Sequence, residues 1–174
     1  MKKCLLLTVT LAFLLNIPAF GETPQTNYFA LYFNGSRCGY DIQTRKVEGE
    51  RVISTDNIVL ELERMGTPVK LDVKETAIET NKGIPISFKA TQKISTMDMS
   101  IEGDITPDGK MKVRVTNAGN TQELVQDYPK GAVMTEGLLL AFKRHGLKKG
   151  ASYKAELFSP SNLMAMKFTF NVGD

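Results

Sequence analysis

The recurrence of apolar residues at every second position between 58 and 78 is the feature that most constrains the fold. Apolar side chains occupy every second position in two runs, Ile58 to Leu62 and Val69 to Val73, and Gly66-Thr67-Pro68 interrupts them. A period of two is typical of strands with one apolar and one solvated face. The interruption is short enough to reverse the chain, so we predict an antiparallel hairpin over 51–64 and 67–80. Its apolar faces are expected to form one wall of a core.

Strand-like segments recur along most of the chain. They are 28–33, 37–46, 84–88, 97–102, 110–115, 121–126, 153–157 and 163–172, separated by turn sequences such as Asn34-Gly35. The run 28–33 is apolar throughout, which favours a strand covered on both faces, and alternation in the next segment places Cys38 on an inward face. About ten strands rarely stay flat. We therefore predict a mainly β protein with a single antiparallel, strongly curved meander sheet, a half-barrel or a rolled sandwich.

One segment departs from this period. Between Thr135 and His145 the apolar residues cluster at helical spacing, and basic residues gather before Gly146. We predict one short helix over 135–145 with Thr135 as its N-cap. Gly137 weakens this helix by about 1 kcal/mol relative to alanine. The helix is expected to close an open end of the sheet.

The amino end predicts export. Two lysines precede an apolar run over 4–15, and small residues follow up to Gly21, which together indicate a signal peptide over 1–21 and a single β-rich domain over 22–174. An uncleaved membrane anchor is the alternative, but the run is shorter than the about 20 residues of a spanning helix. We expect a periplasmic or secreted protein that associates with the membrane only through its signal peptide before cleavage.

Cleavage changes the charge and the cysteine count. The formal net charge falls from +3 to +1, because Lys2 and Lys3 leave with the signal peptide and no acidic residue does. A near-neutral domain offers little field to attract phosphate backbones, so no nucleic-acid binding is expected. Only Cys38 remains, so no intrachain disulfide can form.

Cys38 and His145 are the one pair of side chains that could support thiol chemistry. A thiol nucleophile needs a lowered pKa, commonly from a helix amino end or a neighbouring imidazole. Cys38 is predicted on a strand and His145 at the carboxyl end of the helix, so we expect no catalytic residue and no enzymatic activity; a Cys-dependent enzyme using Cys38 and His145 is the alternative. One cysteine and one histidine cannot supply a structural zinc site. No metal and no cofactor are expected.

Methionines and helix residues offer a candidate ligand site. Met is flexible and polarizable, and a curved sheet capped by a helix can enclose a small apolar groove for a lipid or a peptide. The candidate ligand-binding residues are Met97, Met99, Leu139, Phe142, Met164 and Met166. Filling of the core is the alternative role for the same residues.

Several turn and strand markers resemble those of a known family. They are the run Tyr28-Phe29-Ala30-Leu31-Tyr32-Phe33-Asn34-Gly35-Ser36-Arg37-Cys38-Gly39-Tyr40, then Leu62 to Gly66, Glu79 to Pro85, Gly150 with Tyr153, Phe158-Ser159-Pro160 and Val172-Gly173. The chain resembles the β-rich amino-terminal domain of exported bacterial transglutaminase-like proteins over nearly the whole of 22–174. Exported β-domains of unknown function with the same hairpin are similar as well.

The resemblance implies an accessory module and not an acyl transferase. In that family a separate papain-like domain carries the Cys, His, Asp triad, and this chain reaches Asp174 before such a domain could begin. Cys38 stands where the family usually has an aliphatic residue, which implies packing. We predict an exported non-enzymatic β-domain that binds a protein partner or an apolar ligand in the bacterial envelope. The alternative is a lipid- or lipoprotein-carrier-like half-barrel with the helix as its lid.

Overall fold

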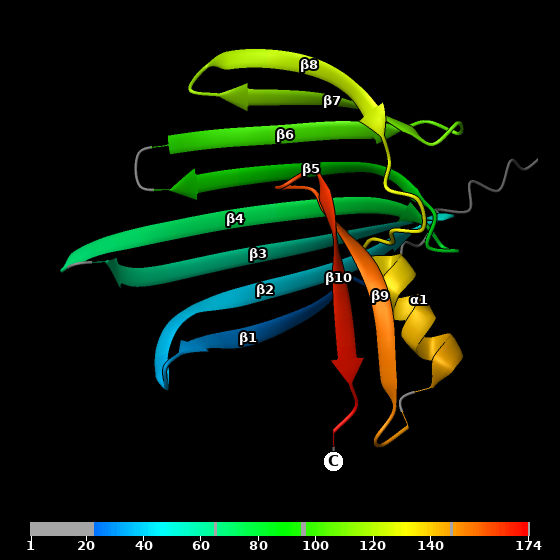
Figure 1. Ribbon diagram of the computed structural model, residues 1–174, viewed down its shortest axis with the longest axis horizontal. Coiled ribbons are helices and arrows are strands. Elements are labelled where there is room, and N and C mark those ends of the chain that lie inside the picture. Colours follow the sequence, from blue (N-terminus) through cyan, green and yellow to red (C-terminus); the bar gives the residue numbers. More distant parts are fainter. Residues whose placement is uncertain (1–22, 65, 95–96, 147, 174) are drawn as a thin grey trace, which may run out of the picture.

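An eight-stranded antiparallel sheet, in which each strand pairs with its neighbours in sequence, dominates the computed structural model. The structure describes residues 23–64, 66–94, 97–146 and 148–173, so the predicted signal peptide over 1–21 lies outside the described residues. The elements are β1 (Gln25–Phe33), β2 (Ser36–Glu48), β3 (Arg51–Arg64), β4 (Thr67–Thr80), β5 (Pro85–Ile94), β6 (Met97–Ile105), β7 (Lys110–Asn117), β8 (Asn120–Asp127), α1 (Thr135–His145), β9 (Ser152–Ser159) and β10 (Met164–Asn171). The predicted mainly β class and the antiparallel curved meander are confirmed (Figure 1).

Local sequence explains the strand boundaries at the β1–β2 and β3–β4 hairpins. Asn34 and Gly35 both have positive φ, 49° and 78°, as the two-residue turn of an Asn-Gly hairpin requires. The strands β3 and β4 have the bounds expected from the alternation, and they pair along their full length from Arg51 with Thr80 to Arg64 with Thr67. The predicted long hairpin is therefore confirmed.

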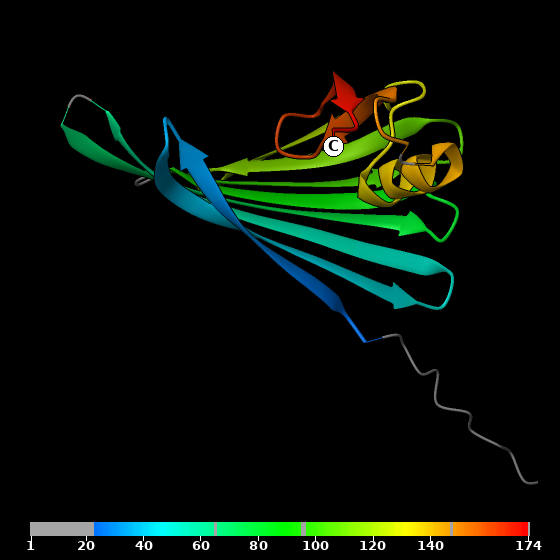
Figure 2. The same ribbon diagram turned by 90° about the horizontal axis from the view of Figure 1, so that it is seen from below.

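The last two strands leave the sheet, which corrects the expectation of about ten strands in one sheet. β9 and β10 form a separate hairpin that lies across the strands of the sheet, with α1 beside it (Figure 1). Figure 2 shows the hairpin and the helix on the same side of the sheet, which we call the inner face; the opposite side is the outer face. In this position Phe158 of β9 is buried, and removal of its ring from water favours the arrangement.

The hydrophobic core lies between the hairpin and the inner face of β4 to β7. The ring of Phe158 lies 5.1 Å from that of Phe88 and 5.0 Å from that of Tyr128, measured between centroids. The other buried members of the core are Ala77, Ala90, Ile101, Met111, Val113, Ala132 and Met134. The predicted hairpin forms only part of the core wall, because Ala77 of β4 belongs to this cluster. The alternate apolar residues of the runs 58–62 and 69–73 share the inner face with Ala77 but lie outside the cluster. The β9–β10 hairpin covers the other end of β4, where Ala77 lies.

Helix α1 has the predicted bounds but not the predicted cap. Met134 occupies the N-cap position and makes no side-chain hydrogen bond there. The capping group is the carboxylate of Glu79 on β4, which accepts hydrogen bonds from the backbone N–H groups of Glu136 at 2.6 Å and Gly137 at 2.9 Å. Gly137 also allows a close approach, since a Cβ on Gly83 would lie 2.6 Å from its Cα. Thr135 is therefore not the cap, and Gly137 has a packing role.

Strand β1 is an edge strand, which corrects the prediction that it is covered on both faces. Its one partner in the sheet is β2, and eight of its nine residues are exposed. Tyr28 is 75% exposed and Tyr32 is 66% exposed. A continuous apolar run is typical of a buried strand, so the exposure of this one calls for a functional explanation.

Candidate functional site

Strand β2 directs its polar residues toward the inner face. Arg45 contacts Glu136 of α1. Asp41 and Gln43 lie at alternate positions before Arg45, so they share its face of the strand. Tyr40 and Ile42 consequently face outward, the reverse of the usual arrangement in a half-buried strand. A polar inner face in contact with the helix and the hairpin is the strongest sign of a specialised site in the described chain.

The polar inner face continues on the next two strands. Ser54 and Asp56 on β3 pair in register with Ala77 and Glu75 on β4, and Asp56 is also opposite Gln43. Two carboxylates directly opposite each other in a sheet repel. Burial, together with the smaller effects of the negative charges on Asp41 and Glu75, raises the pKa of Asp56 to about 6. We call Asp41, Asp56 and Glu75 the acidic floor.

The members of the acidic floor differ in how well they are hydrogen bonded. Asp41 is 8% exposed, and its Oδ2 accepts a hydrogen bond from Nε2 of Gln43 at 2.8 Å, but its Oδ1 has no partner among the described residues. Burial raises the pKa of Asp41, and the hydrogen bond from Gln43 opposes that shift. The hydroxyl of Ser54, which is 4% exposed, has no described partner either. Buried polar atoms without partners are uncommon in folded proteins, so each of these calls for an explanation, such as a bound water or ion.

Glu75 connects the acidic floor to the β9–β10 hairpin through hydrogen bonds. Its Oε1 accepts hydrogen bonds from the hydroxyl of Ser159 at 3.1 Å, from the backbone N–H of Ser161 at 2.9 Å, and from the hydroxyl of Ser161. Gln92 of β5 adds a hydrogen bond from its Nε2 to the carbonyl oxygen of Ser161 at 2.9 Å. The turn between β9 and β10 is thereby fixed over the middle of the sheet.

A second group of charges attaches the helix to the sheet. Nε of Arg45 lies 2.7 Å from Oε2 of Glu136, and Nη2 lies 3.0 Å from Oε1, a bidentate ion pair. The carboxylate of Glu79 caps the same first turn and is fully buried. Burial raises the pKa of Glu79, although its two hydrogen bonds with backbone N–H groups oppose the shift. These contacts have a structural role, because every group in them is paired.

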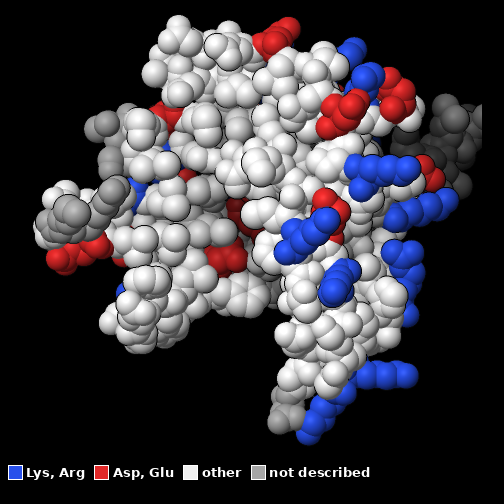
Figure 3. Space-filling view, viewed as in Figure 1, with Lys and Arg blue, Asp and Glu red and all other residues white. Residues whose placement is uncertain are grey.

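A small cavity lies between the acidic floor and the hairpin. Its volume is about 50 Å³, and it is lined by Ser54, Asp56, Glu75, Ala77, Met134, Thr135, Leu157, Phe158 and Pro160. Figure 3 shows acidic atoms recessed in the hollow beside the hairpin. The cavity thus has one polar wall, from the sheet, and one mainly apolar wall, from the hairpin and the linker before α1.

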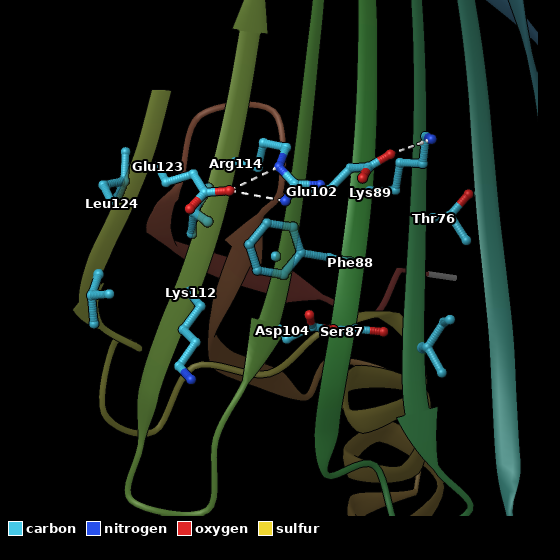
Figure 4. A pocket seen from close by; sticks show the side chains of 14 residues that line it. Thr76, Ser87, Phe88, Lys89, Glu102, Asp104, Lys112, Arg114, Glu123 and Leu124 are labelled. Atoms are coloured by element: carbon cyan, nitrogen blue, oxygen red, sulfur yellow. Dashed lines mark hydrogen bonds and ion pairs between the residues drawn. The ribbon is translucent and has the colours of Figure 1, made fainter. Parts of the chain in front are cut away.

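A larger hollow, of about 600 Å³, lies on the outer face and has a different character (Figure 4). Two pairs of its charged side chains are exposed and pair across neighbouring strands, Lys89 with Glu102 and Arg114 with Glu123. Its lining holds three basic and three acidic residues in all. Exposed pairs of this kind contribute about 0 to 1 kcal/mol each and are common on solvated sheet faces. Because its charges neutralise one another, this hollow is a weaker candidate than the small cavity.

The predicted apolar groove residues are distributed over three elements. Met97 and Met99 lie on β6, Leu139 and Phe142 on α1, and Met164 and Met166 on β10. Met99 packs against the core and lines a hollow of about 280 Å³, which none of the other five residues lines. Phe142 packs against Phe170 of β10, with ring centroids 5.0 Å apart. Met97, Met164 and Met166 are exposed.

Cys38 and His145 are not neighbours in the fold. Cys38 is the extra residue of a bulge opposite Leu31 and Tyr32, so it falls outside the alternation that was expected to turn it inward. It is half-buried, and its thiol lies 3.5 Å from the carbonyl oxygen of Leu31. The ring of His145 packs against Tyr153 at 5.5 Å. The β1–β2 turn, next to Cys38, and α1 lie at opposite ends of the sheet in both views (Figure 1, Figure 2).

No protein-family model, curated protein or solved structure matches this chain. Within residues 23–173, apart from the undescribed positions, no helix is long and apolar enough to cross a membrane. The same residues contain no group of three or more Asp, Glu, His or Cys side chains placed to hold a metal ion.

The sequence analysis did not predict the acidic floor, although the residue pattern of β2 contains a signal for it. Asp41, Gln43 and Arg45 alternate with Tyr40 and Ile42. The alternation identifies two faces, and the usual rule assigns the apolar one to the interior. In β2 the polar face is the inner one, and its Arg45 contacts Glu136 of the helix, so the rule selects the wrong side.

Proposed function

We propose that this chain is an exported, non-enzymatic binding domain of the bacterial envelope, and that an extended segment of a protein partner pairs with the free edge of β1. The observation that carries this proposal is the composition of that edge. Among residues Gln25–Phe33 there is no charged residue and no proline, and four aromatic side chains are exposed. Natural edge strands usually carry lysine, proline or bulges that prevent pairing with another chain.

The opposite edge of the sheet is protected in the usual way. β8 carries Glu123 and Asp127, and both are paired with basic residues of β7. A partner strand would have to break these pairs or bury their charges, whereas it meets no charge along β1. The contrast between the two edges favours β1 as the docking position.

Strand addition would use both the backbone and the side chains of β1. The unpaired backbone groups of the edge supply hydrogen bonds, and aromatic side chains supply most of the binding free energy in many protein interfaces. Tyr28 and Tyr32 are suited to this, because each combines a large apolar ring with a hydroxyl. The resemblance to the amino-terminal β-domain of transglutaminase-like proteins agrees with an accessory module of this kind.

Site-specific photocross-linking tests the proposal in the native host. A photoreactive phenylalanine analogue at Tyr28 is expected to give one discrete cross-linked protein, and the same analogue at Val125 of β8, which is also exposed, is expected to give none. Tyr32→Lys places a charge on the edge and is expected to abolish the product, whereas Val125→Lys leaves it unchanged. A product containing two copies of this chain, or equal labelling from both edges, contradicts the proposal.

A lipid or lipoprotein carrier is the second candidate, favoured by one observation. The inward-facing apolar residues in 58–62 and 69–73 lie outside the core cluster, so the inner face keeps an apolar area beyond the hairpin. Native mass spectrometry of protein taken from its own envelope distinguishes this candidate. A retained lipid mass supports the carrier, and a mass equal to the polypeptide alone counts against it.

A further inference from the structure

The starting observation is a buried hydroxyl without a partner. Ser54 is 4% exposed, its Oγ has no described hydrogen-bond partner, and it lines the cavity beneath the hairpin. Leaving a buried hydroxyl unpaired is unfavourable by about 1–3 kcal/mol. Since the cavity has room for one or two groups the size of water, a bound group that hydrogen bonds to Ser54 removes this cost.

The charged residues around the cavity indicate the sign of the charge that a bound group would carry. On the inner face of β2 to β4 and in the first turn of α1, the described acidic residues are Asp41, Asp56, Glu75, Glu79 and Glu136, and the described basic residue is Arg45. Arg45 is bound bidentately to Glu136. The acidic floor thus keeps an excess of negative charge next to an unpaired oxygen of Asp41 and the unpaired hydroxyl of Ser54. A cation is the complementary ligand.

The shape of the cavity specifies the kind of cation. No three described metal-ligating side chains converge, which disfavours a divalent metal ion. One wall is polar, from Ser54, Asp56 and Glu75, and the facing wall includes Met134, Leu157 and Phe158. An ammonium group on an alkyl stem matches both walls. An amine linked to phosphate, as in a lipid headgroup, brings a negative charge that the acidic floor repels.

We propose that this cavity binds the aminoalkyl end of a lysine side chain carried by a protein partner. The ammonium group donates its hydrogen bonds to Ser54 and to the carboxylates of Asp56 and Glu75, and the charge of Asp41 adds attraction from the neighbouring strand. All three hydrogen bonds from the hairpin turn reach Oε1 of Glu75, so its Oε2 is outside them. The inference rests on the proposed function, because it takes a protein partner as the source of the lysine.

Binding of lysine is expected to depend on pH. The groups that face Asp56 are Asp41 and Gln43 from β2, Glu75 from β4, the neutral Ser159 and Ser161 from the hairpin turn, and the paired Arg45 and Glu136 toward α1. Burial and like charges raise the pKa of Asp56 to about 6. Protonation of Asp56 removes the main attraction, so the affinity weakens as the pH falls through about 6.

The test uses small probes and the purified protein. Nα-acetyl-lysine N-methylamide is added while amide chemical shifts of Ser54 and Asp56 are followed by NMR. Saturable shifts are expected, with an affinity at least about tenfold higher than that of the norleucine analogue, which has the same stem without the amine. Asp56→Asn is expected to lower the affinity by about tenfold, and Asp104→Asn, on the outer face, to leave it unchanged.

The possible outcomes separate this inference from the proposed function. Equal binding of the norleucine analogue, or full binding to a folded Asp56→Asn variant, overturns the lysine site. Tighter binding of phosphoethanolamine than of the lysine probe assigns the site to a lipid headgroup and also overturns it. Loss of the cross-link at Tyr28 with retained lysine binding instead rejects docking at β1 and keeps the cavity. Asp56→Asn is expected to fold, because it removes repulsion within the acidic floor.

Discussion

The carboxylate of Glu79 caps helix α1 through the backbone N–H of Glu136, 57 residues further along the chain. The side chain of Glu136 in turn binds Arg45, so two successive contacts connect β4, α1 and β2. The helix therefore takes its position from the sheet and not from a residue in its own sequence. Since α1 borders the linker that lines the cavity, these contacts also position the candidate site.

Loss of the cap is expected to destabilise the fold. Glu79→Gln keeps the size of the side chain but replaces one acceptor oxygen with an NH2 group that cannot accept from a helix amide. We expect the free energy of unfolding in urea to fall by about 1–3 kcal/mol, the usual effect of leaving a buried donor unpaired. Glu123→Gln, at an exposed ion pair, is the control and is expected to change it by less than about 1 kcal/mol. Equal effects would contradict the capping role.

The close approach of the β4–β5 turn to the helix can be measured with two glycine variants. Gly83 and Gly119 both have positive φ. A Cβ added to Gly83 would lie 2.6 Å from the Cα of Gly137, whereas a Cβ added to Gly119 would have no atom within 4 Å. In both alanine variants, backbone strain is expected to lower the free energy of unfolding by about 1–3 kcal/mol. Gly83→Ala is expected to lower the unfolding free energy by more than Gly119→Ala does. Similar losses would show that the contact can relax.

The pH dependence of stability is expected to carry a signature of Asp56. Its pKa is raised from 3.8 to about 6 on folding, so the folded state holds the proton more tightly than the unfolded state does. Stability therefore falls as the pH rises from about 4 to about 6, by up to about 3 kcal/mol from this group. Asp56→Asn is expected to flatten that part of the curve, measured by urea unfolding across the range. Asp104→Asn is expected to leave it unchanged, and an unaltered slope in Asp56→Asn rejects the shift.

The hairpin is expected to depend on one aromatic residue. Phe158 is 2% exposed and packs against Phe88 and Tyr128. Phe158→Ala is expected to lower the free energy of unfolding by about 3–5 kcal/mol. Phe168→Ala, on the other strand of the hairpin and 38% exposed, is expected to cost less than half as much. A comparable loss in both variants would mean that the core does not centre on Phe158.

Much of the architecture is encoded locally. The bounds of β3 and β4, the Asn34-Gly35 turn and the span of α1 all follow from patterns within a few residues, and the structure confirms them. Strand pairing between sequence neighbours is predictable for the same reason, because a short turn leaves little choice of partner. The signal peptide, the partner and the envelope location are predictions that the structure does not test.

The sequence by itself determined where strands, turns and the helix form, because backbone periodicity and turn chemistry act over short distances. Only the tertiary structure decided which face is covered, since alternation defines two faces without saying which one the hairpin will meet. In the tertiary structure Asp41, Gln43 and Arg45 face inward, and the apolar strand β1 lies at an edge of the sheet. The tertiary structure also supplied the helix cap from Glu79, a contact between residues distant in the chain that no local pattern records.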